Sequence, residues 1–540
     1  MRWKAARCFR DVGKRYLRRR DTVLHGRILV TACRVMDISE EREAIMLKRK
    51  RWAVPESRRA EWCFYLSLAM LSLFVFLLMG KPGYVLFDDS GSYMDLYLNM
   101  EGVMPVYPLF LHVNKLLFGE SRYLYVVVVE QAALASVCVI ILVGVLKRQF
   151  QLKYWEAYVC YILTLLPFTT DLPQAMTTHV ILTEGIAYAL FYLFSAALMC
   201  SIWNKSLMWL SMLYVITLLL SSTRSQLQIL FGVCGVAFIY IVLLRKSDSG
   251  NKRMLLRLLC ALAGCMIIGL TGIWITGRVS STYQQIRVEA RKEQQAAEGK
   301  RPALKTSQYV TLIFSRGMYE ADQEDYLLFE DEKLRELFLE MYPAVDDSGY
   351  RYAYASPGLW MWQDIAGGIG AVGGVCFRVQ SDYYQENYPE LVYDDSYSAV
   401  RSKDQLQIGL TLLGAHFGRF LYHTLIMLPQ AFICTVFFQI ERIYLFCHLV
   451  TLFLYVSAAA MMIWAYKSRE VRNAYGEFMC AVLGTNLVMI VVISMVFFGQ
   501  QRYLVYNFGL FYISYFLLLM QVWKLYGRGL VVKLWKRRGK

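Results

Sequence analysis

Residues 123–146 read YLYVVVVEQAALASVCVIILVGVL, an apolar run in which Glu130 is the only charged side chain. A helix needs about 20 apolar residues to cross the hydrocarbon core of a membrane, so this run is predicted to span one. Similar runs recur along the chain and predict ten spans in all, at 62–80, 123–146, 155–170, 178–202, 206–222, 226–244, 255–276, 442–466, 474–498 and 503–523. The predicted fold class is an all-α polytopic membrane protein with about ten transmembrane helices.

The composition of the whole chain supports a membrane protein. Of 540 residues, 57% are hydrophobic and 19% are charged, whereas soluble domains are about 45–50% apolar and about 25% charged. The mean hydropathy is +0.37. These values exclude a soluble multidomain protein, and so large an apolar fraction excludes an intrinsically disordered chain. The lipid bilayer is therefore the first predicted partner.

Basic residues are concentrated at both ends of the chain. Residues 1–61 contain 18 Lys and Arg against 8 Asp and Glu, and residues 521–540 contain 7 basic residues and no acidic one. Under the positive-inside rule both termini are predicted to be cytoplasmic, close to anionic lipid. The other interpretation, nucleic-acid binding by basic arms, lacks an accompanying binding module. No nucleic-acid partner is therefore predicted.

The order of the spans divides the links between two sides. With a cytoplasmic N-terminus, the links after every second span are also cytoplasmic, and they carry basic residues such as Lys147, Arg148, Lys205 and Lys467. The resulting organisation is a basic cytoplasmic segment at 1–61, a module of seven spans at 62–276 with a first outer loop at 81–122, an extracytoplasmic domain at 277–404, an amphipathic or re-entrant outer-face segment at 405–441, and three spans with a basic cytoplasmic tail at 442–540.

Residues 277–404 lie between the seventh and eighth spans and are long enough for a folded insertion of α or α+β type. They contain 14 basic and 21 acidic residues and are rich in Tyr and Trp. Such side chains suit either stacking against sugar rings or an aromatic belt at the membrane surface. The run Gly367–Gly374 lacks the spacing of a phosphate-binding loop, and it is predicted to be a flexible loop.

The first outer loop contains the adjacent acids Asp88 and Asp89, followed by Tyr93, which is a candidate for binding the substrate. Neighbouring carboxylates at a membrane surface can act as a general base or hold a divalent cation, and each raises the proton affinity of the other. The alternative is that one of the two acids caps a short helix that begins near Ser90. A divalent cation is thus permitted but not required, and the sequence identifies no cofactor.

The order of these features resembles that of the GT-C glycosyltransferases, the superfamily of protein O-mannosyltransferases and aminoarabinose transferases. The resemblance begins with the basic N-terminus, one span, the Asp88-Asp89 loop, Tyr93, and Pro105-Val106-Tyr107-Pro108 before the second span. Three later stretches also resemble family features: the acid-bearing entry to the fourth span at 177–185, a Thr-Arg-Pro-like link at 223–226 with Ser in place of Pro, and the Arg-Tyr-Leu of residues 502–504. The resemblance covers roughly 62–245 and 474–525, whereas 277–404 matches no domain of the family.

The resemblance implies an activity and a mechanism. GT-C enzymes take a sugar from a polyprenyl-phosphate or polyprenyl-pyrophosphate carrier. By the resemblance, Asp88, with Asp89 as second choice, takes a proton from the acceptor or orients it. The acceptor then attacks the anomeric carbon with inversion, and the lipid phosphate leaves. The acceptor itself, whether protein, lipid or glycan, leaves no trace in the sequence.

Charged residues at the outer face are candidates for binding the donor. Arg224 and Arg502, with Tyr503 beside the latter, are predicted to hold the carrier phosphate, since guanidinium groups bind phosphate through paired N–H bonds. The alternative for each arginine is an anchor that snorkels to the membrane surface. Glu184 is expected roughly two turns into the fourth span. An acid there faces a cavity or a substrate, or else makes a structural hydrogen bond between helices.

Four further residues are candidates for the site, and each has an alternative role that involves no substrate. Asp171 is either a second acid near the site or part of a solvated turn. His179 either touches the substrate or is an interfacial histidine with its hydrogen bonds satisfied. His416 and Arg419, in the segment 405–441, either contact the phosphate or anchor that segment at the interface.

The sequence thus predicts an enzyme, a membrane glycosyltransferase that moves a hexosyl or pentosyl group from a polyprenyl-phosphate-linked donor to an acceptor on the extracytoplasmic side of a bacterial plasma membrane. One alternative is a polysaccharide polymerase, which would not need the acid pair. Another is a flippase or transporter of lipid-linked sugars, a class that usually shows inverted repeats and mid-membrane charges. A third is a non-catalytic scaffold for cell-envelope assembly, in which Asp88 and Arg224 are dispensable.

Overall fold

The computed structural model describes most of the chain, and the all-α class is confirmed. The described residues are 58–78, 83–87, 89–94, 103–169, 176–244, 251–298, 308–358, 361–392, 397–436, 443–468, 473–496 and 501–524. In these residues no strand occurs, and an isolated parallel bridge joins Val85 to Val180. Contacts divide the chain into two units, Met1–Ser67 and Leu68–Lys540. The helix α3 (Arg58–Leu78) begins in the first unit and ends in the second.

Within the described residues, eight helices are long and apolar enough to cross a membrane, and each coincides with a predicted span. The protein is therefore an integral membrane protein, as the sequence predicts. The eight are α3, α6 (Tyr123–Phe150), α9 (Glu184–Asn204), α11 (Leu230–Leu244) together with the preceding turn η2 (Ser225–Ile229), α12 (Asn251–Glu298), α19 (Tyr444–Ser468), α20 (Asn473–Val496), and α22 (Phe508–Val522) together with the preceding turn η6 (Val505–Asn507).

The other two predicted spans correspond to shorter helices. Helix α10 (Leu207–Thr223) has 17 residues. The run 155–170 is divided into α7 (Tyr154–Thr164) and α8 (Leu166–Thr169). Pro167 lies just beyond α7 and has no N–H group with which to extend that helix. Because α7, α8 and α10 are each shorter than a bilayer crossing usually requires, the count of ten spans stays a prediction.

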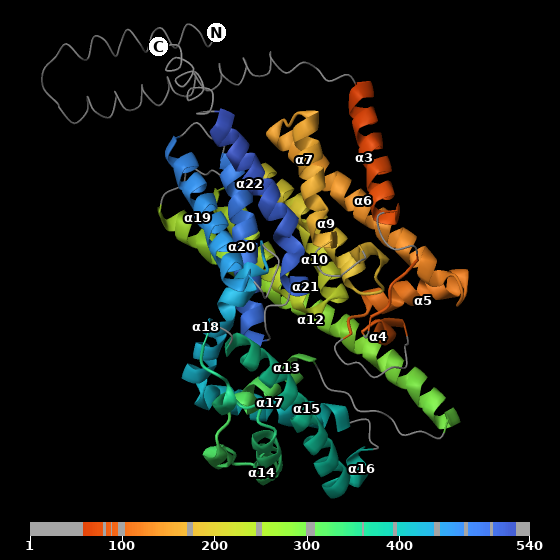
Figure 1. The fold of residues 1–540 in the computed structure, drawn as a ribbon, viewed down its shortest axis with the longest axis vertical. Helices are drawn as coiled ribbons and strands as arrows, with labels where there is room; N and C mark the ends of the chain where they lie inside the picture. Colours follow the sequence, from red (N-terminus) through yellow and green to blue (C-terminus); the bar gives the residue numbers. More distant parts are fainter. Residues whose placement is uncertain are drawn as a thin grey trace, which may run out of the picture. The chain divides into compact units, whose positions relative to one another are not determined.

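Helix α9 is the centre of the bundle, where it packs against α6, α10 and α11 (Figure 1). In its most apolar segment 83% of the residues are buried, against 17% in α19 and 11% in α12. Close packing at its start depends on Gly185, because a Cβ there would lie 2.1 Å from the amide oxygen of Gln131. The helices with exposed apolar surfaces, α12 and α19, are the ones expected to face lipid.

Short links make successive helices of the bundle antiparallel. The turn between α9 and α10 contains Lys205 in a left-handed conformation (φ 49°). At the same end, the Lys524 ammonium lies 2.9 Å from the carboxylate of Glu156, which ties the end of α22 to the start of α7. Lys147 and Arg148, in the last turn of α6, belong to this end too. Of the basic residues predicted to be cytoplasmic, Lys147, Arg148, Lys205 and Lys524 therefore lie at one end of the bundle.

At the opposite end, the first outer loop packs on the bundle through short helices. The loop itself contributes α4 (Ser90–Met94) and α5 (Val106–Phe118). Three further short helices lie at this end: η1 (Thr177–His179) leads into α9, and α21 (Gln501–Leu504) and η6 (Val505–Asn507) lead into α22. The Tyr107 hydroxyl donates a hydrogen bond to Gln131 on α6 at 3.0 Å. Gln131 in turn donates to the carbonyl of Thr178 at 2.9 Å, so the loop, α6 and η1 form one packed unit.

Helix α12 has 48 residues and is therefore about 72 Å long. Its apolar segment ends at Tyr283, but the helix continues to Glu298. The boundary predicted at 276 thus falls inside a helix, and the polar stretch that follows the seventh predicted span remains helical.

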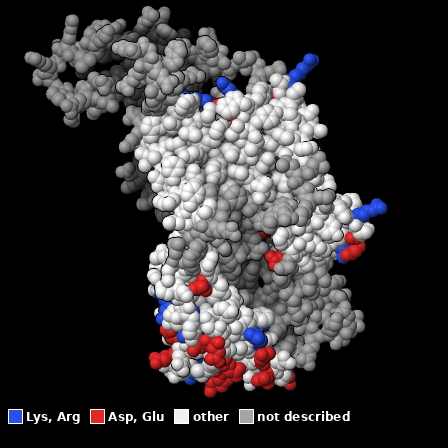
Figure 2. All heavy atoms as spheres, in the orientation of Figure 1, with Lys and Arg blue, Asp and Glu red and all other residues white. Residues whose placement is uncertain are grey.

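The insertion after α12 is helical in its described residues, so it is α rather than α+β. Its elements are α13 (Gln308–Glu320), η3 (Gln323–Leu328), α14 (Glu332–Asp347), η4 (Tyr352–Tyr354), α15 (Met361–Asn387), α16 (Pro389–Val392), α17 (Tyr397–Ala415) and α18 (Phe417–Ile433). We call residues 308–433 the outer domain. Its core includes Phe314, Leu337, Phe338 and Ile369. On the face shown in Figure 2, Asp and Glu gather over this domain, while the bundle presents mostly uncharged side chains.

The prediction of a flexible loop at Gly367–Gly374 is wrong, because these residues lie within α15. A Cβ at Gly368 would lie 2.6 Å from the carbonyl oxygen of Tyr350, and one at Gly373 would lie 2.3 Å from the Ser315 hydroxyl. The glycines therefore allow close approach of neighbouring backbone and helices, and this packing compensates for their low helix propensity.

The predicted segment 405–441 is divided between two helices that meet at His416. Helix α17 packs on α13 inside the outer domain, whereas α18 packs on α20 and α19. Pro429 is accommodated within α18. This stretch therefore links the outer domain to the last helices of the bundle.

Candidate functional site

Two antiparallel helices bring an acid and a base together at the end of the bundle opposite the basic links. Glu184 is the first residue of α9, and Arg224 is the capping residue at the end of α10. Because α9 and α10 form a hairpin, these two ends are neighbours. An acid at a helix N-terminus and a base at a helix C-terminus each complement the helix dipole. The local structure therefore favours a pair between them.

Glu184 and Arg224 form an ion pair between Oε1 and Nη1. Both side chains are buried, with 6% and 11% of their surface exposed. The Thr183 hydroxyl also donates to Glu184 Oε2 at 3.0 Å. The expected depth of Glu184 is corrected, because η1 and the extended Val180 precede α9 and place Glu184 at its first turn, not two turns inside. A buried acid at this position is stabilised by its partners.

Aromatic side chains from α21 and η6, which precede α22, lie next to this ion pair. The guanidinium of Arg224 lies 5.3 Å from the centre of the Tyr503 ring, within the range of a cation–π contact. Gln226 donates a hydrogen bond to the Tyr506 hydroxyl at 3.4 Å. The link after α10 and the segment before α22, about 280 residues apart in sequence, are therefore side by side.

Tyr93 of the first outer loop lies near the ion pair, since Arg224, Glu184 and Thr183 all influence its pKa. Burial is the largest cause that raises the pKa of Tyr93 above its usual 10.0, and the charges of Glu184 and Asp89 act in the same direction. Arg224 and a hydrogen bond with Thr183 oppose this shift of the pKa without cancelling it. Because its pKa is raised, Tyr93 stays a neutral hydroxyl at pH 7.

The structure describes only some of the other predicted site residues. Asp88 and Asp171 lie outside the described residues. Arg502 belongs to α21, but its side chain is outside the described part of the structure. His179 is buried, and its ring nitrogens lie 2.9 Å and 2.7 Å from the carbonyl oxygens of Gly83 and Phe76. That histidine fastens the backbone at the end of α3, which fits the structural alternative for it.

Arg224 gives this arrangement a guanidinium group, which can bind an anion. A guanidinium offers five N–H donors in a plane, of which the Glu184 carboxylate engages Nη1. Among the residues that the structure describes, no three or more His, Cys, Asp and Glu side chains are grouped to hold a metal ion.

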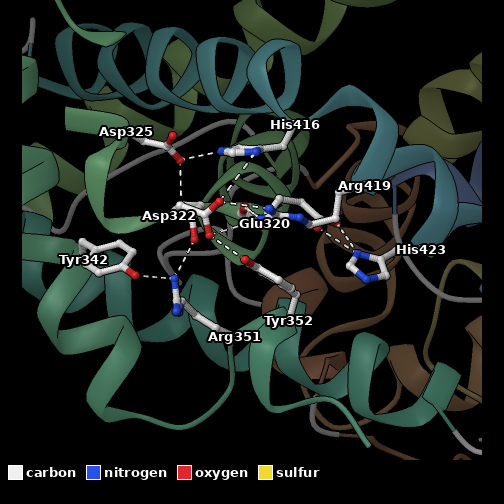
Figure 3. A network of polar contacts seen from close by, with 10 residues as sticks. Glu320, Asp322, Asp325, Tyr342, Arg351, Tyr352, His416, Arg419 and His423 are labelled. Atoms are coloured by element: carbon white, nitrogen blue, oxygen red, sulfur yellow. Dashed lines mark hydrogen bonds and ion pairs between the residues drawn. The ribbon is translucent and has the colours of Figure 1, made fainter. Parts of the chain in front are cut away.

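A second polar cluster, in the outer domain, was not predicted as a site. His416 Nε2 lies 2.6 Å from the carboxylate of Asp325, and Arg419 lies 2.9 Å from that of Asp322. The Tyr352 hydroxyl also donates to Asp322, at 2.5 Å. Figure 3 shows these side chains converging from η3, η4 and α18. His416 and Arg419, which the sequence offers as phosphate contacts, thus have carboxylate partners within the domain.

Deeper in the domain, His423 contacts the carboxylate of Glu320 at 2.8 Å, and Arg316 lies 3.4 Å from the same acid. All three side chains are almost fully buried. The sequence gives no signal for the contact between His423 and Glu320, which are 103 residues apart, whereas Arg316 and Glu320 are four residues apart on α13. The cluster around His416 and Arg419 does have a local sequence signal, because Asp322 and Asp325 are three residues apart. The Asp325 carboxylate accepts a hydrogen bond from the Asp322 backbone N–H at 2.7 Å.

Comparisons of this chain with known protein families, with curated proteins and with solved structures find no match. The resemblance to GT-C enzymes therefore rests on the residues quoted for it.

Proposed function

We propose that this protein is a membrane glycosyltransferase that moves a sugar from a polyprenyl-phosphate-linked donor to an acceptor on the extracytoplasmic side. The observation that carries the proposal is the meeting of Tyr93, Glu184, Arg224 and Tyr503 at one end of the bundle. These residues come from four distant segments, and each was selected from the sequence as a site residue. A shared site explains their convergence more economically than four unrelated contacts.

In this proposal, Arg224 stabilises the negative charge that grows on the carrier phosphate as the bond between sugar and phosphate breaks. Glu184 orients the guanidinium, and Tyr503 covers one of its faces. Asp88 or Asp89 accepts the proton of the acceptor nucleophile, which attacks the anomeric carbon. The carrier phosphate departs with the bonding electron pair, and the configuration at that carbon is inverted.

The same proposal includes an orientation. The end of the bundle with Lys147, Arg148 and Lys205 faces the cytoplasm, together with both termini, and the site faces outward. The membrane is then a bacterial plasma membrane, and the outer domain lies in the extracytoplasmic space. The support for this orientation is the separation of the basic links from the ion pair along the bundle.

The test is a transfer assay with purified protein in lipid, a radiolabelled pool of polyprenyl-phosphate sugars and an envelope extract. Wild type, Asp88→Asn and Asp89→Asn are compared. We expect wild type to transfer label and one variant to lose at least about 100-fold of the rate, because a general base contributes that much. If both variants transfer label like the wild type, neither acid is the base. If the wild type moves no label and binds no polyprenyl phosphate, the scaffold is the better hypothesis.

A second comparison separates phosphate binding by Arg224 from a purely structural role. The double variant Glu184→Gln/Arg224→Gln replaces two buried charges with two neutral amides, so no buried charge is left without a partner. We expect this variant to fold and to lose transfer. A folded double variant with wild-type transfer would assign the pair to helix packing alone. The conservative single variant Arg224→Lys keeps the charge and should retain part of the rate.

A further inference from the structure

The outer domain carries a partly exposed row of tyrosines and carboxylates at the surface of the polar cluster. Tyr350 and Tyr354 are each 53% exposed. The side chains of Asp322 and Asp346 are 39% and 37% exposed. We call this the tyrosine–carboxylate surface, and it consists of Asp322, Asp346, Tyr350, Tyr352, Tyr354 and Arg419. It is separate from the site between α9 and α10.

We propose that the tyrosine–carboxylate surface binds a neutral glycan. Sugars present apolar C–H faces, which pack on aromatic rings, and hydroxyl groups, which donate to carboxylates and accept from guanidinium groups. The surface offers all three partners: Asp322 before η3 and Asp346 in the last turn of α14 are the carboxylates, the tyrosines lie at and before η4, and Arg419 lies in α18. Under the proposed function this glycan would be the acceptor, but the binding itself does not depend on transfer.

Two rings of this surface, Tyr352 and Tyr354, are held in place without a ligand. The Tyr352 hydroxyl donates to Asp322 at 2.5 Å, and the guanidinium of Arg419 stacks over the Tyr352 ring at 3.8 Å. The Tyr354 hydroxyl donates to Asp346 at 3.1 Å. Groups fixed in this way lose little conformational entropy when a ligand binds, which favours recognition of weakly binding ligands such as sugars.

The charges favour a neutral ligand over an anionic one. Arg419 already lies 2.9 Å from Asp322, and Arg351 lies 2.8 Å from Asp346, so each guanidinium has a carboxylate partner. The surrounding residues 277–404 carry 21 acidic against 14 basic groups. A phosphorylated or uronic-acid glycan would be repelled by this excess of acidic groups. A neutral oligosaccharide avoids that repulsion.

The experiment uses the full chain in lipid nanodiscs prepared without maltoside detergents, because a sugar head group would occupy the surface. Binding is measured on an array of neutral and uronic-acid-bearing oligosaccharides, and then as a Kd for the best neutral probe. We expect neutral glycans to bind and acidic ones not to. Tyr354→Ala should raise the Kd about fivefold to tenfold, as loss of an aromatic contact implies. Tyr354→Phe keeps the ring and should stay within about twofold of wild type.

The matched control is Tyr388→Ala, which truncates another half-exposed tyrosine. Tyr388 lies by Lys333 in the first turn of α14, whereas Tyr354 lies by Asp346 in its last turn. Wild-type Kd is expected for this variant. Thermal unfolding of each variant shows whether the domain remains folded. The proposal is overturned if no neutral glycan binds wild type, if acidic glycans bind best, or if folded Tyr354→Ala binds like wild type.

Failure of this proposal is distinct from failure of the proposed function. Binding is measured without donor, so the double variant Glu184→Gln/Arg224→Gln should bind the glycan like wild type even when it transfers no sugar. Conversely, a wild-type chain that transfers sugar but binds no neutral glycan would refute this surface and leave the enzyme intact.

Discussion

At the residue scale, the ion pair between Glu184 and Arg224 makes each of the two buried charges dependent on the other. We expect Arg224→Ala to lower the free energy of unfolding by about 3–5 kcal/mol, because it leaves the Glu184 carboxylate buried and unpaired. The measurement is denaturant unfolding in detergent micelles. The double variant Glu184→Gln/Arg224→Gln should recover most of the loss. Equal stability of Arg224→Ala and wild type would contradict the burial of the pair.

Asp322 makes the stability of the outer domain depend on pH. Burial alone would raise the pKa of its carboxyl, but hydrogen bonds from Arg419 and Tyr352 outweigh burial and lower the pKa below its usual 3.8. Because the pKa is lower in the folded chain than in the unfolded chain, the carboxylate stabilises the fold above about pH 4. That contribution is lost as the pH falls through the lowered pKa.

The corresponding variant is Asp322→Asn, studied by urea unfolding of the full chain between pH 3 and pH 7. The difference in stability between wild type and this variant should be largest near neutral pH and should shrink in acid. Asp347→Asn, at a nearby exposed acid, is the control and should show a much smaller difference. A constant difference across the pH range would show that the Asp322 charge contributes nothing.

At the scale of elements, α13 and α17 touch backbone to backbone. A Cβ at Gly409 would lie 2.8 Å from the Phe314 Cα, and one at Gly317 would lie 2.8 Å from the carbonyl oxygen of Gly409. We expect Gly409→Ala to destabilise the protein by about 1–3 kcal/mol, because the helices must move apart. Thermal or denaturant unfolding measures this loss.

The matched control lies on the same helix. Gly414 has no atom within 4 Å of a Cβ position, so Gly414→Ala should be neutral or stabilising by up to about 1 kcal/mol. If both alanine variants behave alike, the close crossing of α13 and α17 is not what these glycines provide.

At the scale of the whole molecule, the orientation of the bundle in the membrane can be measured directly. Cysteines are introduced at Ser356, an exposed position of the outer domain, and at Lys205, in the turn between α9 and α10. A membrane-impermeant maleimide should label Ser356→Cys in intact cells and Lys205→Cys only after permeabilisation. The wild-type chain, with its 13 native cysteines, sets the background. The reverse pattern would place the basic links outside and exclude the proposed orientation.

The sequence predicts part of the candidate site but not its contacts. It selects Glu184 and Arg224 because charged residues near apolar spans are rare and need partners. It does not show that they are partners of each other, nor that Tyr503 stacks on the guanidinium. It also misplaces Glu184 within its helix, because the extended residues around Val180 pair with Val85, about 95 positions earlier, and delay the start of α9.

What the sequence by itself determined is the membrane-embedded helical class and eight helices long and apolar enough to cross a membrane, because the cost of burying unpaired peptide groups in lipid favours helices in long apolar runs. Tertiary structure alone decided the helix at Gly367–Gly374, since those glycines are stabilised by neighbours that only folding supplies. It also decided the partners of His416 and Arg419, which lie 91 and 97 residues from their acids. Hydrophobicity is a property of a local run of residues, whereas an ion pair or a helix crossing depends on which distant segments meet.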